Sequence, residues 1–182
     1  DRGLAGAYNA NILRKSYEQI RQWEGAGIDV SLITVGRKGR EWMLRHGPPL
    51  RADFVGLSDR PTSNDIGPIA SILIDDFTAG EFDAVYLAYT DFISTLRQDP
   101  VVRQLLPIVP VKLERQVAED YIFEPDPQTI LGEVLRGLTE LQILQALYES
   151  IASEQSARMV AMRNATDAAN DLIGELTLSY NK

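Results

Sequence analysis

The last third of the sequence limits most strongly what this chain can fold into. Residues 127–182 contain no proline after Pro127, and apolar or small side chains recur there at alternating steps of three and four. From Leu131 to Tyr180 the pattern is sustained for seven heptads, which predicts a left-handed coiled coil. We call these positions the seam: Leu131, Val134, Leu138, Leu141, Gln145, Tyr148, Ala152, Gln155, Met159, Met162, Thr166, Ala169, Ile173, Leu176 and Tyr180.

A single helix over residues 127–182 would be roughly 84 Å long at about 1.5 Å per residue. Gly132, Gly137 and Gly174 each weaken it by about 1 kcal/mol relative to alanine, so a break near Gly137 is the alternative. The middle of the seam is small or polar, which favours a specific partner over a general zipper. No other segment is long enough to be that partner, so we expect it in a missing part of the chain or in another chain.

The first two thirds alternate between helical and strand-like patterns. Helices are predicted over residues 8–23, 37–45 and 64–79, where apolar residues recur with a period of 3.6. Strands are predicted over residues 28–35, 50–57 and 83–88, followed by an antiparallel hairpin of residues 89–96 and 101–109 around Gln98, Asp99 and Pro100. This order predicts an α/β, Rossmann-like domain with a mainly parallel sheet over residues 1–126, followed by the long helix 127–182.

Composition excludes several classes of function. The net charge of -8 argues against a general nucleic-acid binder, which needs a basic surface. The chain has no cysteine, so it holds no disulfide, thiolate metal site or cysteine nucleophile. No run of apolar residues approaches the length of a membrane span, and no pattern typical of a signal peptide opens the chain.

No motif in the sequence predicts a catalytic, cofactor or metal site. The glycine-rich residues 3–7 lack the spacing of a dinucleotide fingerprint, so a tight turn is favoured over a phosphate site. His46 is the only histidine and has no partners for a zinc site or a nucleophile relay. The cations at Arg37, Lys38 and Arg40 indicate a solvated turn, and the acidic residues before the long helix, Glu124 and Asp126, indicate helix capping.

Three stretches, taken together, resemble a known family. They are Asp-Arg-Gly-Leu-Ala-Gly at 1–6, Tyr-Ile-Phe-Glu-Pro-Asp-Pro at 121–127, and the Ser-Glu-Gln-Ser-Ala-Arg-Met-Val-Ala-Met run at 153–162 with Asn-Ala-Thr at 164–166 and Leu-Ser-Tyr-Asn-Lys at 178–182. In this order they resemble the gamma subunit of the rotary F-type ATP synthase over the whole chain. The family has a further N-terminal helix and strand and a longer C-terminal helix. We therefore expect this chain, with its abrupt start and uncapped end, to be a piece of a longer one.

The resemblance implies a mechanical function without catalysis and without a cofactor. Two long helices of the family form an antiparallel coiled coil inside a hexamer of alpha and beta subunits, while the α/β domain lies beside epsilon on the membrane rotor ring of c subunits. Proton flow turns the ring, and the shaft drives three catalytic sites through different states. The absence of a cysteine-containing insertion favours a bacterial enzyme, peripheral to the cell membrane on its cytoplasmic side.

The resemblance also implies roles for individual residues. Tyr121, Phe123 and Glu124 would contact the rotor ring, although local core packing is the alternative for the two aromatics. Glu154, Arg158 and Lys182 would project toward a beta subunit, although Arg158 could merely pair with Glu154 one turn away. A structural turn that holds the domain against the coil would be formed by Asp1, Arg2, Gly3 and Leu4.

Two other classes of function stay open at this point: a small α/β nucleotide-binding protein, and a coiled-coil adaptor unrelated to rotation. Saturable nucleotide binding would favour the first, and failure to recognise epsilon or the rotor ring would favour the second. With its seam unpaired, we expect the isolated fragment to self-associate or to fray beyond about Ile151.

Overall fold

The structure is a computed structural model that describes residues 3–109 and 126–181. Those residues form two compact units. Unit 1 contains residues 3–59, 88–101 and 149–181, and unit 2 contains residues 60–87, 102–109 and 126–148. Six of the predicted site residues lie outside the described residues: Asp1, Arg2, Tyr121, Phe123, Glu124 and Lys182.

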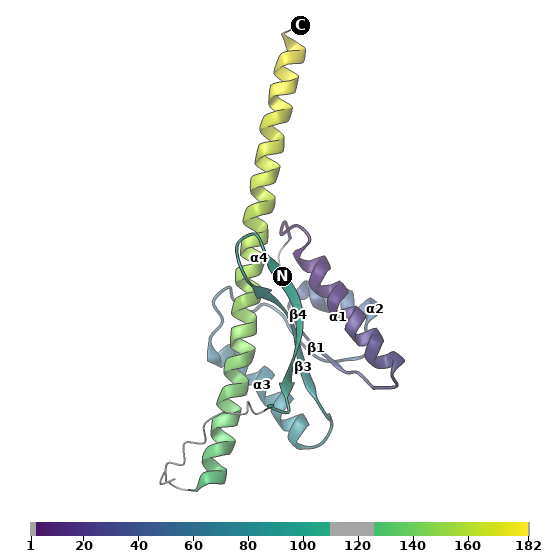
Figure 1. The fold of residues 1–182 in the computed structure, drawn as a ribbon, viewed down its shortest axis with the longest axis vertical. Coiled ribbons are helices and arrows are strands. Elements are labelled where there is room, and N and C mark those ends of the chain that lie inside the picture. The colour runs from purple at the N-terminus through teal and green to yellow at the C-terminus, as the bar shows by residue number, and fades with distance from the viewer. Residues whose placement is uncertain (1–2, 110–125, 182) are drawn as a thin grey trace, which may run out of the picture. The chain divides into compact units, whose positions relative to one another are not determined.

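The order of elements confirms a mixed α/β fold with a long C-terminal helix (Figure 1). The elements are α1 (Tyr8–Gly25), β1 (Leu32–Val35), α2 (Arg37–His46), β2 (Leu50–Phe54), α3 (Ser63–Thr78), β3 (Val85–Phe92), β4 (Gln98–Leu106) and α4 (Pro127–Tyr180). The three cations expected in a turn instead lie in the first turn of α2, where Arg40 pairs with Asp53 of β2 at 2.8 Å.

In unit 1, β1 and β2 form a parallel pair connected through α2, as the alternating pattern predicts. The chain enters α2 at Gly36, whose φ of 105° favours glycine, and the Gly36 amide donates to the Phe54 carbonyl at 2.8 Å. Trp42 of α2 packs edge-on against Tyr17 of α1, with ring centroids 5.3 Å apart. The backbone hydrogen bond of Gly36 thus ties the start of α2 to β2, and the ring contact of Trp42 holds α2 against α1.

The second sheet pairs β3 with β4, and here the predicted boundaries were wrong. Residues 83–88 and 89–96 were expected as two segments, but Val85–Phe92 is one strand. The turn lies at Ser94 and Arg97, whose backbones exchange hydrogen bonds of 2.9 and 3.1 Å, and Pro100 lies inside β4. The expectation of a turn at Gln98, Asp99 and Pro100 gave proline too much weight, because an edge strand tolerates it.

In unit 2, α3 provides the apolar core through Ile66, Ile69, Ala70 and Leu73. The helix begins after Thr62, whose amide and hydroxyl donate to the Asp65 carboxylate at 2.7 and 2.9 Å. These two hydrogen bonds lower the pKa of Asp65 below its usual value.

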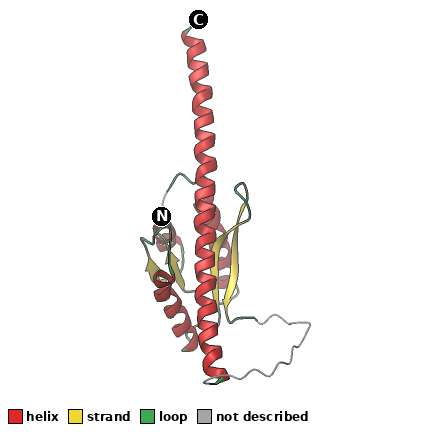
Figure 2. Cartoon of the chain, turned by 90° about the vertical axis from the view of Figure 1, so that its left-hand side faces the viewer, coloured by secondary structure: helices red, strands yellow, loops and turns green. Residues whose placement is uncertain are grey.

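Helix α4 is continuous from Pro127 to Tyr180, and no break occurs near Gly137 (Figure 2). Its start is capped as predicted for Asp126, whose carboxylate accepts hydrogen bonds from the amide and hydroxyl of Thr129 at 2.9 and 2.6 Å. Capping and packing of one face outweigh the cost of the three glycines.

Candidate functional site

Most of the seam of α4 is exposed rather than packed against this chain; Tyr148, whose hydroxyl donates to the Pro61 carbonyl at 2.6 Å, is an exception. Its large apolar side chains are between 42% and 91% exposed: Leu131, Val134, Leu138, Leu141, Tyr148, Met159, Met162, Ile173, Leu176 and Tyr180. Among the residues that the structure describes, no second helix covers them. A row of apolar side chains this long marks a surface for association.

The opposite side of α4 makes the internal contacts. In unit 2, Thr139, Ile143 and Ala146 are buried, and in unit 1 Ser153 is fully buried. Small and hydroxyl-bearing residues on this side let neighbouring backbone approach the helix closely. The helix therefore has two distinct sides: one packs against its own units, and the other is the open seam.

In unit 1, four residues join α1, β3 and α4 in one hydrogen-bonded cluster, which we call the hydroxyl cluster: Tyr8, Thr90, Ser150 and Ser153. Tyr8 Oη donates to the Ser150 carbonyl at 3.0 Å. The Thr90 amide donates to Ser150 Oγ at 3.4 Å, and Ser153 Oγ donates to the Thr90 carbonyl at 3.3 Å. Two serines, three residues apart on α4, thus bind both backbone groups of one residue of β3.

Burial governs the chemistry of this cluster. Ser153 is 0% exposed and Thr90 is 3% exposed. Burial raises the pKa of Tyr8 above its usual value, the Ser150 and Thr90 hydrogen-bonding groups partly oppose the rise, and the negative charge of Glu154 adds to it. Tyr8 is therefore a neutral hydrogen-bond donor at physiological pH and not an acid–base group.

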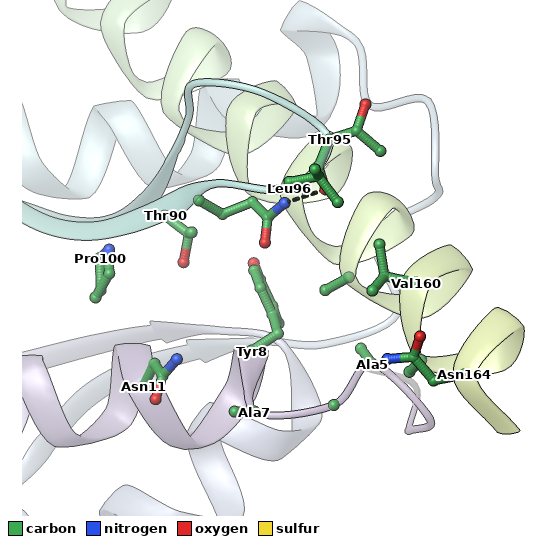
Figure 3. A pocket seen from close by; sticks show the side chains of 14 residues that line it. Ala5, Ala7, Tyr8, Asn11, Thr90, Thr95, Leu96, Pro100, Val160 and Asn164 are labelled. Atoms are coloured by element: carbon green, nitrogen blue, oxygen red, sulfur yellow. Dashed lines mark hydrogen bonds between the residues drawn. The ribbon is translucent and has the colours of Figure 1, made fainter. Parts of the chain in front are cut away.

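An open pocket of about 240 Å³ lies beside the hydroxyl cluster, within unit 1. Figure 3 shows Tyr8 and Thr90 pointing toward each other, with Val160 and Asn164 contributed by α4. Alanines and a glycine line much of the remaining wall. Around the cluster, α4 and the start of the chain therefore meet mainly through small side chains.

The predicted site residues Glu154, Arg158, Gly3 and Leu4 lie close to this cluster. Arg158 pairs with Glu154 one turn away, and its Nε donates to the Gly3 carbonyl at 3.4 Å. The side chains of Arg158 and Glu154 are only 12% and 18% exposed. Leu4 has a φ of 63° and is largely exposed in the turn before α1. The pairing raised as the alternative is thus present, and contact with a beta subunit stays a prediction.

Sequence reasoning missed Tyr8, Thr90, Ser150 and Ser153. The available signal was their position on α4: Ser150 and Ser153 lie on the side opposite the seam, where a solvated helix face would carry charge. Their partners on α1 and β3 are far away in the sequence, and no local pattern links them.

Other groups considered in the sequence have local partners. His46 ends α2 rather than lying in the following loop, stacks on Trp42 at a centroid distance of 4.6 Å, and bonds the Trp42 carbonyl through Nδ1 at 3.0 Å. Asp75 pairs with Arg136 at 3.2 Å within unit 2. Within residues 3–109 and 126–181, no group of three or more histidine, aspartate or glutamate side chains is placed to bind a metal ion. No helix in those ranges has the length and apolar character needed to cross a membrane.

Comparison with known proteins gives consistent matches along the whole chain. A family model described as ATP synthase matches residues 1–182. The ATP synthase gamma chain of Dehalococcoides mccartyi strain CBDB1 is 49% identical over 182 residues, which cover 100% of this chain and 63% of that relative. The gamma chain of Ralstonia nicotianae is 46% identical over 188 residues, covering 100% of this chain and 65% of the relative. The chain thus spans less than two thirds of the length of these relatives.

Two solved structures have a similar fold. A chain of the Tetrahymena thermophila mitochondrial ATP synthase central stalk/c-ring matches with a TM-score of 0.72 at 23% identity, over 91% of this chain and 72% of that chain. A chain of the Euglena gracilis mitochondrial ATP synthase rotor matches with a TM-score of 0.67 at 19% identity, over 100% of this chain and 69% of that chain. At these identities the likeness concerns the fold.

Proposed function

The chain belongs to the ATP synthase family, and from this premise we propose that it acts as the larger part of a gamma subunit, the rotor shaft of a proton-translocating ATP synthase. In this role it carries rotation from the membrane ring to the catalytic alpha and beta subunits and catalyses nothing itself. The complex is peripheral to a bacterial cell membrane on its cytoplasmic side. The identities of 49% and 46% to bacterial gamma chains support this assignment.

The observation that carries the proposal is the exposed seam on a helix of 54 residues. A shaft of this kind is a coiled coil, and the seam has the heptad spacing and exposure that pairing requires. The side chains that cover it in our proposal come from a second, antiparallel helix in the portion of the relatives that this chain does not span. Without that helix, the chain self-associates through the seam.

The base of the shaft is proposed to meet the epsilon subunit and the ring of c subunits. In this proposal Tyr121, Phe123 and Glu124 contact the ring, while Glu154, Arg158 and Lys182 contact the alpha/beta hexamer. The residues 1–126 act as the base domain and residues 127–182 as the shaft helix. Glu154 and Arg158 form an ion pair with each other in unit 1. In this proposal they therefore contact the hexamer as a pair, through the small part of each side chain that is exposed, and not as separate charges.

A retention experiment tests the proposal. The chain is immobilised and offered the epsilon subunit and the detergent-solubilised c ring from the same source, with a Tyr121→Ala, Glu124→Ala double variant beside it. The matched control is Tyr180→Ala, Glu175→Ala, which removes the same residue types from exposed positions of α4. We expect both partners to be retained by the chain and the control, and the c ring to be retained less by the double variant.

Equal retention by the double variant and the control would refute the ring contact at Tyr121 and Glu124. Failure of the unmodified chain to retain either partner, repeated after the chain is extended to the length of its relatives, would refute the rotor assignment itself.

A further inference from the structure

The geometry of the hydroxyl cluster is suited to fixing the rotation angle of α4 about its own axis. Ser150 and Ser153 engage the amide and the carbonyl of the same residue, Thr90, while Tyr8 engages the backbone of α4 from a third element. The three elements α1, β3 and α4 therefore meet within one turn of α4. All of these hydrogen bonds can form together only at one rotation angle of α4 about its own axis.

The tolerance of this setting follows from helix dimensions. The Oγ atoms of Ser150 and Ser153 lie outside the Cα cylinder of about 2.3 Å radius, roughly 3.5 Å from the helix axis, so a rotation of about 20° moves them by about 1.2 Å. The hydrogen bonds of these two serines, at 3.4 and 3.3 Å, are already near the distance limit and do not survive such a displacement. The cluster thus resists rotation of α4 relative to α1 and β3 beyond a small angle.

Within unit 1, the side chains packed around the cluster offer no comparable resistance to this rotation. The wall between the start of the chain and α4 is lined by Ala5, Gly6, Ala157 and Ala161, which are small and lack interlocking side chains. Burying the hydroxyl of Ser153 is costly unless its partner, the Thr90 carbonyl, is aligned with it. Polar groups of this kind specify register where apolar groups tolerate slippage.

We propose that Tyr8, which binds the Ser150 carbonyl, and Ser150 and Ser153, which bind the backbone of Thr90, are the positioning residues that lock the shaft helix against the base. Torque then passes between α4 and the rest of unit 1 through this cluster. The proposal rests on the rotor function proposed above. Arg158 contributes a further tie, from its Nε to the Gly3 carbonyl at 3.4 Å.

The test measures torsional stiffness in the assembled rotating enzyme, with this subunit extended to the length of its relatives. These 182 residues contain no cysteine, so with a cysteine-free extension a Lys15→Cys change on α1 gives this subunit a single attachment point for a bead. With the hexamer fixed to a surface, the variance of the bead angle during each catalytic pause reports the compliance between the gripped shaft and the base.

The expected effect comes from the four ties named above, treated as equal springs in parallel. Tyr8→Phe removes one tie and raises the angular variance by about 1.3-fold, and Tyr8→Phe with Ser153→Ala removes two and raises it about twofold, both as upper limits. Matched controls are Tyr86→Phe, on β3 outside the cluster and the seam and 42% exposed, and Ser156→Ala, close to Ser153 in the chain. These controls leave the variance unchanged.

The outcomes separate this proposal from the rotor assignment. Unchanged variance in the double variant, in complexes that assemble and hydrolyse ATP like the controls, overturns the torsional lock and leaves the rotor function intact. An unmodified subunit that gives an active complex in which the bead never rotates overturns the rotor function. If the double variant does not assemble, Tyr8→Phe decides alone, because it keeps the ring and removes one oxygen. Variance equal to that of Tyr86→Phe then refutes the lock.

Discussion

Two neighbouring leucines near the end of α4 give a direct test of the seam. Leu176 lies in the seam and is 61% exposed, whereas Leu178 is 69% exposed and lies two residues further on, about 200° around the helix. Leu176→Glu and Leu178→Glu are therefore the same chemical change on two sides of one helix. Glutamate and leucine have similar helix propensity, so intrinsic helix stability changes little in either variant.

The expected magnitude depends on whether the seam is covered. In the chain as it stands, kept monomeric by dilution, both side chains are exposed, and each change alters the unfolding free energy by no more than about 0.5 kcal/mol. In a chain extended to the length of its relatives, pairing buries the remaining three fifths of Leu176. Since full burial of leucine is worth about 1.5–3 kcal/mol, Leu176→Glu costs about 1–2 kcal/mol. The carboxylate adds a desolvation cost, so this range is a lower limit.

The assay is urea unfolding followed by circular dichroism, on the chain and on its extended form. We expect a loss of stability for Leu176→Glu in the extended form alone, and no comparable loss for Leu178→Glu in either form. Equal effects of the two substitutions in the extended form would refute the assignment of the seam as the pairing side.

Further predictions concern the units themselves. Because the pKa of Tyr8 is raised by folding, its contribution to stability is complete below its usual value of 10.0 and is lost as the pH rises through the folded value; Tyr8→Phe should remove this part of the alkaline loss in unfolding titrations from pH 8 to 11. Ile66→Ala should cost about 2–5 kcal/mol in urea unfolding, since Ile66 is 0% exposed, and a cost below about 1 kcal/mol would contradict its place in the core. Asp126→Ala should weaken the first turn of α4 by about 1 kcal/mol, seen as faster hydrogen exchange at the Thr129 amide with no change near Ser153.

Periodicity was sufficient to predict much of the fold. The 3.6-residue pattern located the helices to within about two residues, the usual uncertainty of helix ends, and the seven-heptad seam identified both the length of α4 and its unpaired side. The hairpin was placed less well, because Pro100 reads locally as a turn residue and only pairing with β3 makes it part of a strand. Boundaries decided by pairing partners are not present in local patterns.

The hydroxyl cluster was beyond sequence reasoning for a similar reason. Tyr8 and Ser150 are 142 positions apart, and Thr90 takes part mainly through its backbone, which carries no sequence signal. The resemblance drew attention to the charged residues Glu154 and Arg158, while the adjacent Ser153 makes the most buried contact in this region. Charge is conspicuous in a sequence, whereas an aligned hydroxyl is recognised only in three dimensions.

The central claim is that this chain turns as a shaft inside a catalytic hexamer. The most direct measurement is to assemble the subunit, extended to the length of its relatives and labelled at Lys15→Cys, with its alpha, beta and epsilon partners, and to follow the attached bead while ATP is supplied. The account predicts rotation in one direction, in steps of a third of a turn, one for each catalytic site. ATP hydrolysis by the assembled complex with a bead that shows only thermal motion would contradict it.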